Sequence, residues 1–408
     1  MKRRLLPILM TLVLVCALPI WAAFVTSGDV TNPLLTTADA AELTLQGMID
    51  QANAGDTIKL SSNTEVHATL QITKNLTLDL NGHVLKMTGS GSVLKVSGRA
   101  TLTIQDSSAE GTGTITGGNA EDGGGVYVDD NATLKMTGGC ITGCHAEDGG
   151  GVYIDNNATL KMTGGCITDC HASYGGGGIF SYGNLYMSGT AKIEKCTSKW
   201  GSDDAIWNRE SCNIYADGGT VDGTVNNQGT IRLSEGAAAE TVFNGTVYNR
   251  SAGTIKAGRY NETVENKGTI TGGTFCGGVT NDGGTIEDGA YETVKFNSDN
   301  GAQAKEEKVL RGQRVPNPAA PTKSGHTFTG WCLGDEKYNF DTPVTAPLTL
   351  TAKWEKVPSS GGYYYYPTTD TKTDDTKGSP KTADPGVALY AALSILSLTG
   401  LTCTAKKR

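Results

Sequence analysis

The sequence predicts an all-β protein whose main part is a right-handed parallel β-helix, a solenoid of stacked rungs. The first observation is a repeat within residues 119–196, where Gly123, Gly149 and Gly175 lie 26 residues apart. The second is that apolar residues alternate with polar ones inside each repeat, and no segment of ten or more residues there has helical periodicity. Near-identical repeats in direct order favour a solenoid over the alternative, an antiparallel sandwich of hairpins.

Each repeat is expected to form one rung. Val126, Val128, Leu134 and Met136 alternate with polar residues, which places one face inward and the other outward. Glycine runs and Asn/Asp pairs lie between these short segments and supply tight corners. The sequence therefore predicts three short strands and three corners in each 26-residue rung.

Composition limits the class of partner. The 408 residues include 55 glycines, and the formal charge is −8. Removing the basic residues near both ends makes the remainder more negative still. Nucleic acid is excluded as a partner, because its recognition needs basic patches on the protein. The composition fits a solvated extracellular protein.

The N-terminus is typical of export. Residues 1–23 combine a basic start, an apolar run and small residues at the end, as in a secretory signal peptide. An uncleaved membrane anchor is the alternative. Residues 24–40 are predicted to be a spacer. Residues 43–52 are predicted to form a short amphipathic helix that caps the first rung.

The C-terminus carries a second targeting pattern. A linker at 357–378 precedes residues 379–408, which contain an apolar membrane segment at 387–403 and a basic end. This tail resembles the cell-wall sorting signal of Gram-positive surface proteins, with the pattern Leu-Pro-x-Thr-Gly. Pro380, Lys381, Thr382 and Ala383 occupy the recognition positions, and Ser379 and Ala383 depart from the pattern. The resemblance implies that a sortase joins Thr382 to peptidoglycan. A plain C-terminal membrane anchor is the alternative, and both place the protein on the extracellular face.

Residues 41–300 are assigned to the β-helix. The phrase ITKNLTLDLNGHVL and the repeated GGGVYV…LKMTGGCITGC resemble rungs of bacterial pectate-lyase-like surface β-helices. The resemblance covers about residues 43–290. It implies the fold but not an activity, because that fold carries lyases, hydrolases and inert adhesins. Rungs over 218–290 are shorter, so their core should be thinner.

Residues 305–356 form a different module. The segment 309–354 resembles the Listeria–Bacteroides repeat, the B-repeat of internalin-type surface proteins. The matching residues are Pro321, Gly325, Phe328, Gly330, Trp331, Phe340, Asp341, Val344, Leu348, Leu350, Ala352 and Trp354. The resemblance implies a small β-grasp-like unit with Phe328, Trp331, Phe340 and Trp354 in its core.

Cysteines recur with the repeat. Cys144, Cys170 and Cys196 should stack with parallel side chains, farther apart than a relaxed disulfide requires, so reduced cysteine columns are expected. Disulfides within the columns remain the alternative for an exported protein. A metal site of Cys144, His145, Cys170 and His171 is disfavoured, since adjacent strand residues point to opposite faces.

Carboxylates supply two further site hypotheses. Asp122 with Asp148, and Asp129 with Asp155, should form acidic columns that bind calcium or are simply solvated corners. Asp203 and Asp204 are the only close carboxylate pair in a glycine-flanked corner. They are weak catalytic candidates, because the other residues of a lyase or hydrolase site are incomplete.

Together these patterns predict a cell-wall-anchored, adhesin-like surface protein that binds a glycan or a host or matrix protein without catalysis. Its expected partners are sortase, peptidoglycan and that ligand, and no cofactor is required apart from possible calcium. The alternative is a polysaccharide lyase or hydrolase that uses Asp203 and Asp204. Function is expected where the repeat breaks, around residues 200–208, or on the C-terminal module.

Overall fold

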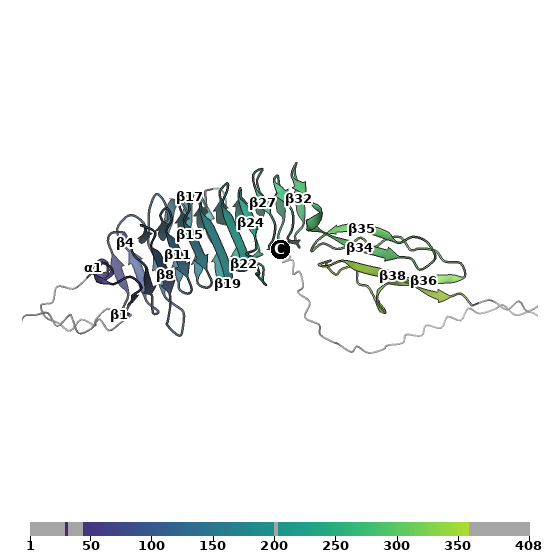
Figure 1. Cartoon of the computed structure of the whole chain (residues 1–408), viewed down its shortest axis with the longest axis horizontal. Helices are drawn as coiled ribbons and strands as arrows, with labels where there is room; N and C mark the ends of the chain where they lie inside the picture. Colours follow the sequence, from purple (N-terminus) through teal and green to yellow (C-terminus); the bar gives the residue numbers. More distant parts are fainter. Residues whose placement is uncertain (1–28, 32–43, 200–202, 359–408) are drawn as a thin grey trace, which may run out of the picture.

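The computed structural model describes residues 29–31, 44–199 and 203–358. They form a parallel β-helix that continues into a second, smaller sheet at its C-terminal end (Figure 1). The predicted signal peptide, the sorting signal and nearly all of the spacer and linker lie outside these residues. Within the described ranges, no helix is long and apolar enough to cross a membrane.

The longest rungs contain four strands, so the expectation of three is wrong for them. One such rung comprises β10 (Val126–Val128), β11 (Thr133–Met136), β12 (Cys140–Thr142) and β13 (His145–Asp148). Each strand pairs in parallel with its counterpart 26 residues later, as Val126 does with Val152. The fourth strand was missed because HAED shows too little apolar alternation.

The described strands of the β-helix form three sheets. The ten-stranded sheet contains β4 (Leu70–Ile72), β7 (Leu94–Val96), β10, β14 (Val152–Ile154), β18 (Ile179–Ser181), β21 (Asp204–Asn208), β23 (Thr224–Asn227), β26 (Val247–Asn249), β29 (Val264–Asn266) and β32 (Val279–Asn281). The three-stranded sheet contains β13, β17 (His171–Gly175) and β20 (Thr197–Ser198), and therefore accompanies only the longest rungs.

The twenty-stranded sheet consists of two columns that the long strands β19 (Asn184–Glu194) and β22 (Asn213–Asp222) connect. The first column also contains β1 (Asp29–Thr31), β2 (Thr57–Lys59), β5 (Leu76–Asp79), β8 (Thr101–Gln105), β11, β15 (Thr159–Met162), β24 (Thr230–Arg232), β27 (Thr254–Ile255), β30 (Thr269–Ile270) and β33 (Thr285–Ile286). The second contains β3 (Thr64–Val66), β6 (Val84–Met87), β9 (Thr114–Thr116), β12, β16 (Cys166–Thr168), β25 (Val242–Phe243), β28 (Arg259–Tyr260) and β31 (Thr274–Phe275).

The glycine run before β10 is needed for close backbone approach. A Cβ on Gly124 would lie 2.4 Å from the carbonyl oxygen of His145 and 2.6 Å from that of Gly150. Gly123 has a φ of 61°, in the left-handed region. Any larger residue at Gly124 would push neighbouring rungs apart.

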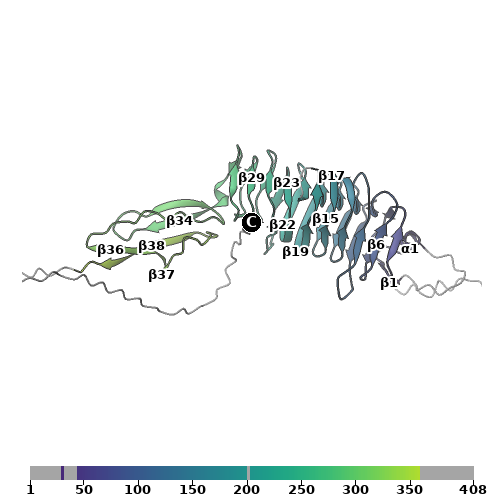
Figure 2. The same cartoon turned by 180° about the vertical axis from the view of Figure 1, so that it is seen from behind.

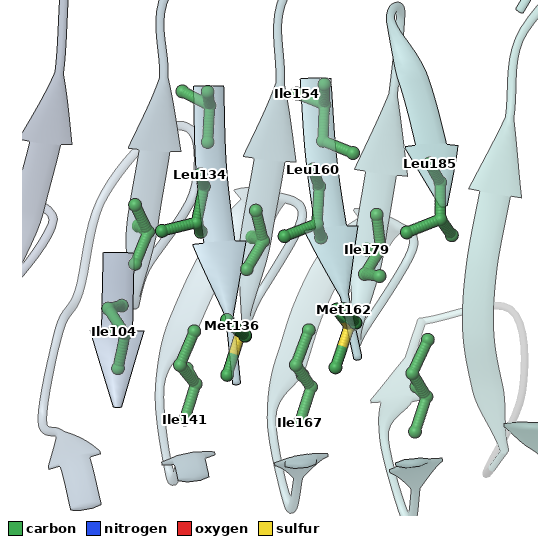
Figure 3. Close-up of a cluster of buried hydrophobic side chains, with 14 of the residues drawn as sticks. Ile104, Leu134, Met136, Ile141, Ile154, Leu160, Met162, Ile167, Ile179 and Leu185 are labelled. Atoms are coloured by element: carbon green, nitrogen blue, oxygen red, sulfur yellow. The ribbon is translucent and has the colours of Figure 1, made fainter. Parts of the chain in front are cut away.

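The interior is filled by side chains that repeat from rung to rung (Figure 3). Leu134, Leu160 and Leu185 lie in one buried row, and Ile141 and Ile167 lie in another. Each row places identical or similar side chains one above the next, so that they pack closely in the core. The periodic alternation in the sequence therefore encodes the core directly.

In the shorter rungs an asparagine ladder replaces apolar residues at one inward position of the ten-stranded sheet. Asn227 donates from Nδ2 to Oδ1 of Asn249 at 2.8 Å, and Asn249 donates to Asn266 at 2.7 Å. Asn208 and Asn281 extend the ladder at its two ends. Because each amide both donates and accepts, the buried column is satisfied from Asn227 to Asn266.

Aromatic side chains fill the core of these shorter rungs. Phe243, Tyr260 and Phe275 are buried and stack with ring centroids 5.0 and 5.2 Å apart. The hydroxyl of Tyr260 donates to the carbonyl of Ala257 at 2.7 Å. These three rings occupy the row that isoleucine fills in the longer rungs. A shorter rung contributes fewer inward residues, and the large rings fill the space that those residues would occupy.

The cysteines divide into two kinds, and the expectation of reduced columns is wrong for one of them. Cys140 and Cys166 form a disulfide across neighbouring rungs with a Cα–Cα distance of 4.5 Å, which a disulfide can span. Cys144, Cys170 and Cys196 are free and buried, as predicted. Their side chains point inward, where Cys170 donates to the Thr168 carbonyl at 3.3 Å.

The N-terminal end carries the predicted helix. In α1 (Leu45–Gln51), Leu45, Met48 and Ile49 are buried against the first rungs, and the Thr44 hydroxyl accepts from the Gly47 N–H. In addition, β1 lies in the predicted spacer and pairs in parallel with β2, Val30 opposite Ile58. β1 thus covers the edge of β2, which would otherwise be open at this end of the sheet.

The second sheet begins earlier than the predicted boundary at residues 300–305. It contains β34 (Tyr291–Asn297), β35 (Lys305–Leu310), β36 (His326–Leu333), β37 (Glu336–Lys337) and β38 (Leu348–Lys356), after the 3₁₀ turn η2 (Asp288–Ala290). The first strand was assigned to the β-helix because its alternation continues the pattern of the rungs. It pairs with β35 and β38 instead.

The order β35-β34-β38-β36-β37, with a parallel central pair, is that of the strands of a β-grasp unit. No α-helix accompanies it within residues 291–358. Trp331 is buried in its core, and Phe328, Phe340 and Trp354 pack around it half-buried, which confirms the predicted aromatic set. Val294 and Phe296 of β34 complete this core.

The junction between the two parts caps the C-terminal end of the β-helix (Figure 2). The Phe275 N–H donates to the Arg311 carbonyl at 2.7 Å, and the Arg311 guanidinium bonds Glu292 at 2.6 Å. Tyr291 and Leu310 pack against the β-helix core. The second module therefore covers the end of the β-helix at β31, whereas β32 and β33 keep exposed residues.

We expect the substitution Asn249→Ala to lower the free energy of unfolding by about 2–4 kcal/mol, because it interrupts the buried ladder between Asn227 and Asn266. Chemical denaturation followed by circular dichroism measures this change. The matched control is Asn281→Ala at the exposed end of the same ladder, for which a loss of at most about 1 kcal/mol is expected. Equal losses at the two positions would show that the ladder does not stabilise the core.

Candidate functional site

An aromatic ladder lies on the outer face of the ten-stranded sheet. We use this name for Tyr127, Tyr153, Phe180 and Trp207, which occupy the same outward position on four successive rungs. Successive ring centroids lie 5.3, 5.7 and 6.1 Å apart, with interplanar angles of 7°, 2° and 25°. The centroid separations are larger than the contact distance between two stacked rings. Each ring is therefore displaced sideways relative to the next, in an offset-stacked arrangement.

The ladder is accessible at its N-terminal end. Tyr127 and Tyr153 are half-buried, whereas Phe180 is only 5% exposed. The Arg209 guanidinium lies 5.3 Å from the Tyr182 ring centroid and 6.0 Å from that of Phe180. Phe180 is therefore covered. Tyr127 and Tyr153 present only the outward edges of their rings, because neighbouring rungs cover the ring faces.

Cations and carboxylates border Tyr127. The Lys95 ammonium lies 4.6 Å from its ring centroid and 3.5 Å from Asp129. The Tyr127 hydroxyl donates to Asp155 at 2.9 Å. Burial and then this hydrogen bond raise the pKa of Tyr127, so its hydroxyl stays protonated at neutral pH.

Asp122 and Asp148 form the second acidic column, at the corner that precedes the sheet. They are bridge partners in neighbouring rungs. Burial, followed by repulsion from Asp148 and Glu121, raises the pKa of Asp122 to about 6. Burial also raises the pKa of Asp148. Both carboxyl groups of this corner therefore keep a proton to a higher pH than an exposed aspartate does.

The structure separates the calcium candidates into two pairs. Asp129 and Asp155 are engaged by Lys95 and Tyr127, and Asp122 and Asp148 lie at the other end of the strands. Two carboxylates supply few of the six to eight oxygens that Ca²⁺ takes. Across the described residues, no three His, Cys, Asp or Glu side chains are grouped as a metal site requires. His145 is exposed and Cys144 buried, so these neighbours face opposite sides.

A groove of about 550 Å³ opens beside Tyr127. We call it the Tyr127 groove, and its lining residues are Thr69, Gln71, Gly91, Ser92, Lys95, Asn119, Ala120, Glu121, Asp122 and Tyr127. Hydroxyl, amide, ammonium and carboxylate groups thus surround one aromatic wall. Such a lining can orient a polar ligand through hydrogen bonds while the ring contacts its apolar side.

Asp203 and Asp204 do not face a common site. Asp203 is exposed, whereas Asp204 is 3% exposed and its Oδ2 accepts from the Gly176 N–H at 3.0 Å. Burial raises the pKa of Asp204, although hydrogen bonds from Ser198, Gly176 and Asn226 oppose it. Asp204 links two rungs. Trp207, from the same segment, belongs to the aromatic ladder.

The sequence contains a signal for the aromatic ladder. Tyr127 and Tyr153 occupy the middle position of VYV and VYI, which alternation alone assigns to the polar, outward side of a strand. Phe180 and Trp207 continue that position in segments where the repeat has changed. Alignment of outward residues across rungs would have identified the ladder.

Comparisons with known proteins identify the C-terminal module. Residues 293–353 match the Listeria-Bacteroides repeat domain, in agreement with the second sheet. A "Putative Gly-rich membrane protein" of Evansella cellulosilytica is 39% identical over 67 residues, which cover 15% of this chain and 8% of that protein. A "Putative membrane protein" of the same organism is 37% identical over 67 residues, covering 15% and 10%. The chain therefore spans about a tenth or less of these relatives. No solved structure matches.

The raised pKa of Asp122 predicts a pH-dependent stability. A carboxyl group with a raised pKa in the folded protein stabilises the fold most below pH 3.8, and this contribution decreases as the pH rises to about 6. Relative to the wild type, Asp122→Asn should gain stability between pH 4 and pH 7, on the order of 1 kcal/mol after solvent screening. Urea unfolding at several pH values measures the difference. The exposed control Glu110→Gln should show no such trend, and parallel curves for Asp122→Asn would contradict the expectation.

Proposed function

We propose that this is a non-catalytic bacterial surface protein that binds a glycan in the Tyr127 groove and along the adjoining aromatic ladder. The observation that carries the proposal is the groove itself, with one tyrosine wall and a rim of hydroxyl, amide and carboxylate side chains. Lys95 and Tyr153 cover the two faces of the Tyr127 ring, so the C–H groups of a sugar would pack against the outward edge of that ring. The hydroxyl groups of the sugar need polar partners of the kind that line this groove.

The charge of the groove limits the kind of glycan. Glu121 and Asp122 lie on its rim together with a single cation, Lys95, which Asp129 also neutralises. An anionic sugar would face a net negative rim. The groove therefore favours neutral or amino sugars.

We place the protein on the extracellular face, joined to the cell wall through the sorting signal at 379–408. The Listeria-Bacteroides repeat domain and the names of the two relatives support a surface location. Sortase and peptidoglycan are the partners that this arrangement implies. In such a chain the β-helix would display its outer faces to the surroundings.

A lyase or hydrolase receives less support. The two carboxylates that would act together differ in exposure, and Asp204 is engaged in linking rungs. Paired acid and base groups need a shared cleft. A binding role requires only the exposed face described above.

The proposal predicts that Tyr127→Ala weakens glycan binding at least tenfold, because the aromatic wall is lost. Tyr127→Phe keeps the ring and should retain most of the affinity. Tyr248→Ala is the matched control, since Tyr248 is a half-buried residue at the same outward position of the same sheet, away from the groove.

An array of glycans and matrix proteins, followed by calorimetry on the best ligand, provides the measurement. Equal affinity of the Tyr127→Ala and Tyr248→Ala variants, or binding to matrix proteins alone, would refute glycan binding in this groove. Release of reducing or unsaturated ends from the glycans would instead establish the enzymatic alternative.

The anchoring proposal has its own test. Thr382→Ala removes the residue whose carbonyl would be joined to peptidoglycan, so the protein should move from the wall fraction to the medium or the membrane. Immunoblots of fractionated cells measure the distribution, with Thr373→Ala in the linker as the control. Unchanged wall-linked protein in the Thr382→Ala strain would exclude sortase attachment at this site.

A further inference from the structure

A second outward-facing row of side chains lies on the first column of the twenty-stranded sheet, a different sheet from that of the aromatic ladder. It runs over six successive rungs in the order Lys135, Lys161, Tyr186, Tyr215, Arg232 and Lys256, which we call the basic file. Strand register aligns the first five residues. The Lys256 N–H donates to the Ile231 carbonyl, which places Lys256 beside Arg232.

The cations of the basic file have no counter-charge of their own. Lys135, Lys161, Arg232 and Lys256 are exposed, and none of them forms an ion pair with any residue that the structure describes. The nearest carboxylate of β22, Asp217, accepts hydrogen bonds from Ser234. In a protein of net charge −8, four unpaired cations in one row are a local reversal of the surface charge.

Tyr186 and Tyr215 lie at the centre of the basic file. Their rings stack with centroids 4.1 Å apart and an interplanar angle of 2°. Lys161 lies 5.0 Å from the Tyr186 centroid, and Arg232 lies 5.6 Å from that of Tyr215. Each outer ring face is thus covered by a cation and each inner face by the other ring. Neither ring offers a free face on which a nucleic acid base or a sugar could stack.

A neutral row runs beside the basic file. It occupies the preceding outward position of the same strands and consists of Thr133, Thr159, Asn184, Asn213, Thr230 and Thr254. Asn213 donates to Asn184 at 3.0 Å, and the threonine hydroxyl groups lie on the same sheet face. Cations in one row and hydroxyl or amide groups in the next match a polymer that carries regular anionic groups and many hydroxyl groups.

We propose that the basic file is a binding surface for an extended anionic polysaccharide that lies along the β-helix axis. Rungs repeat about every 4.8 Å, so the six rungs of the file span roughly 24 Å, the length of several sugar units. The anionic groups of the polymer pair with the two cations at each end, and its hydroxyl groups bond the neutral row. This surface is independent of the Tyr127 groove, whose rim has the opposite charge.

The test is binding of the full chain to heparin, which carries sulfate groups, to polygalacturonate, which carries carboxylates, and to neutral dextran. The double variant Lys161→Glu/Arg232→Glu should bind the anionic polymers at least tenfold more weakly, and raised salt should weaken the wild type strongly. The double variant Lys135→Gln/Lys256→Gln leaves the tyrosine stack intact, and its affinity for the anionic polymers should fall about threefold or more. The control Lys337→Glu/Lys356→Glu makes the same charge change on the second sheet and should bind as the wild type does.

The proposal is supported if the wild type binds heparin or polygalacturonate and both basic-file variants bind that polymer more weakly. Which of the two polymers binds shows whether the surface prefers sulfate or carboxylate groups. The proposal is overturned if neither polymer binds, if the control variant loses as much affinity, or if single-stranded DNA binds more tightly than both. Circular dichroism of each variant shows whether it is folded.

Discussion

The parallel, in-register pairing of each strand with its counterpart one rung later is the constraint on which the rest of this structure depends. Val126 lies beside Val152, and Cys140 lies beside Cys166, because the repeat length and the rung length are the same. Register fixes which side chains point inward and stacks each one on its equivalent. A row of leucine, a row of asparagine and a row of tyrosine are all consequences of that one rule.

Register places equivalent side chains next to one another, so similar residues either stabilise or repel each other. Apolar rows such as Leu134 and Leu160 fill the core, and amides such as Asn227 and Asn249 satisfy one another. Like charges conflict, which is visible in the raised pKa of Asp122 beside Asp148. The same geometry presents an aromatic ladder with an acidic rim on one sheet and a row of four cations on another, so the two faces suit ligands of different charge.

Much of the fold could be predicted from the sequence, because an inward residue in a β-helix is set by local alternation and by the repeat. Alternation at Val126, Val128, Leu134 and Met136 predicted the rung, and α1 was expected from Leu45, Met48 and Ile49. The fourth strand around His145 was missed because it lies on a corner with little apolar character. The first strand of the second sheet was misplaced because its alternation is the same in either sheet.

The candidate site was harder to predict, because it depends on contacts between rungs. Asp203 and Asp204 were chosen for adjacency in sequence, yet one is exposed and the other is buried between rungs. Tyr127 and Tyr153 were overlooked, although register places them side by side. Outward rows become visible only when equivalent positions are compared across rungs whose lengths differ.

Register can be measured directly by peptide mapping of the unreduced protein with mass spectrometry. In-register pairing predicts a Cys140–Cys166 disulfide, together with free thiols at Cys144, Cys170 and Cys196. A disulfide that joins Cys140 to Cys144, or Cys140 to Cys170, would contradict it. Either pairing requires a different placement of side chains on neighbouring rungs, and the outward rows would then not align as described.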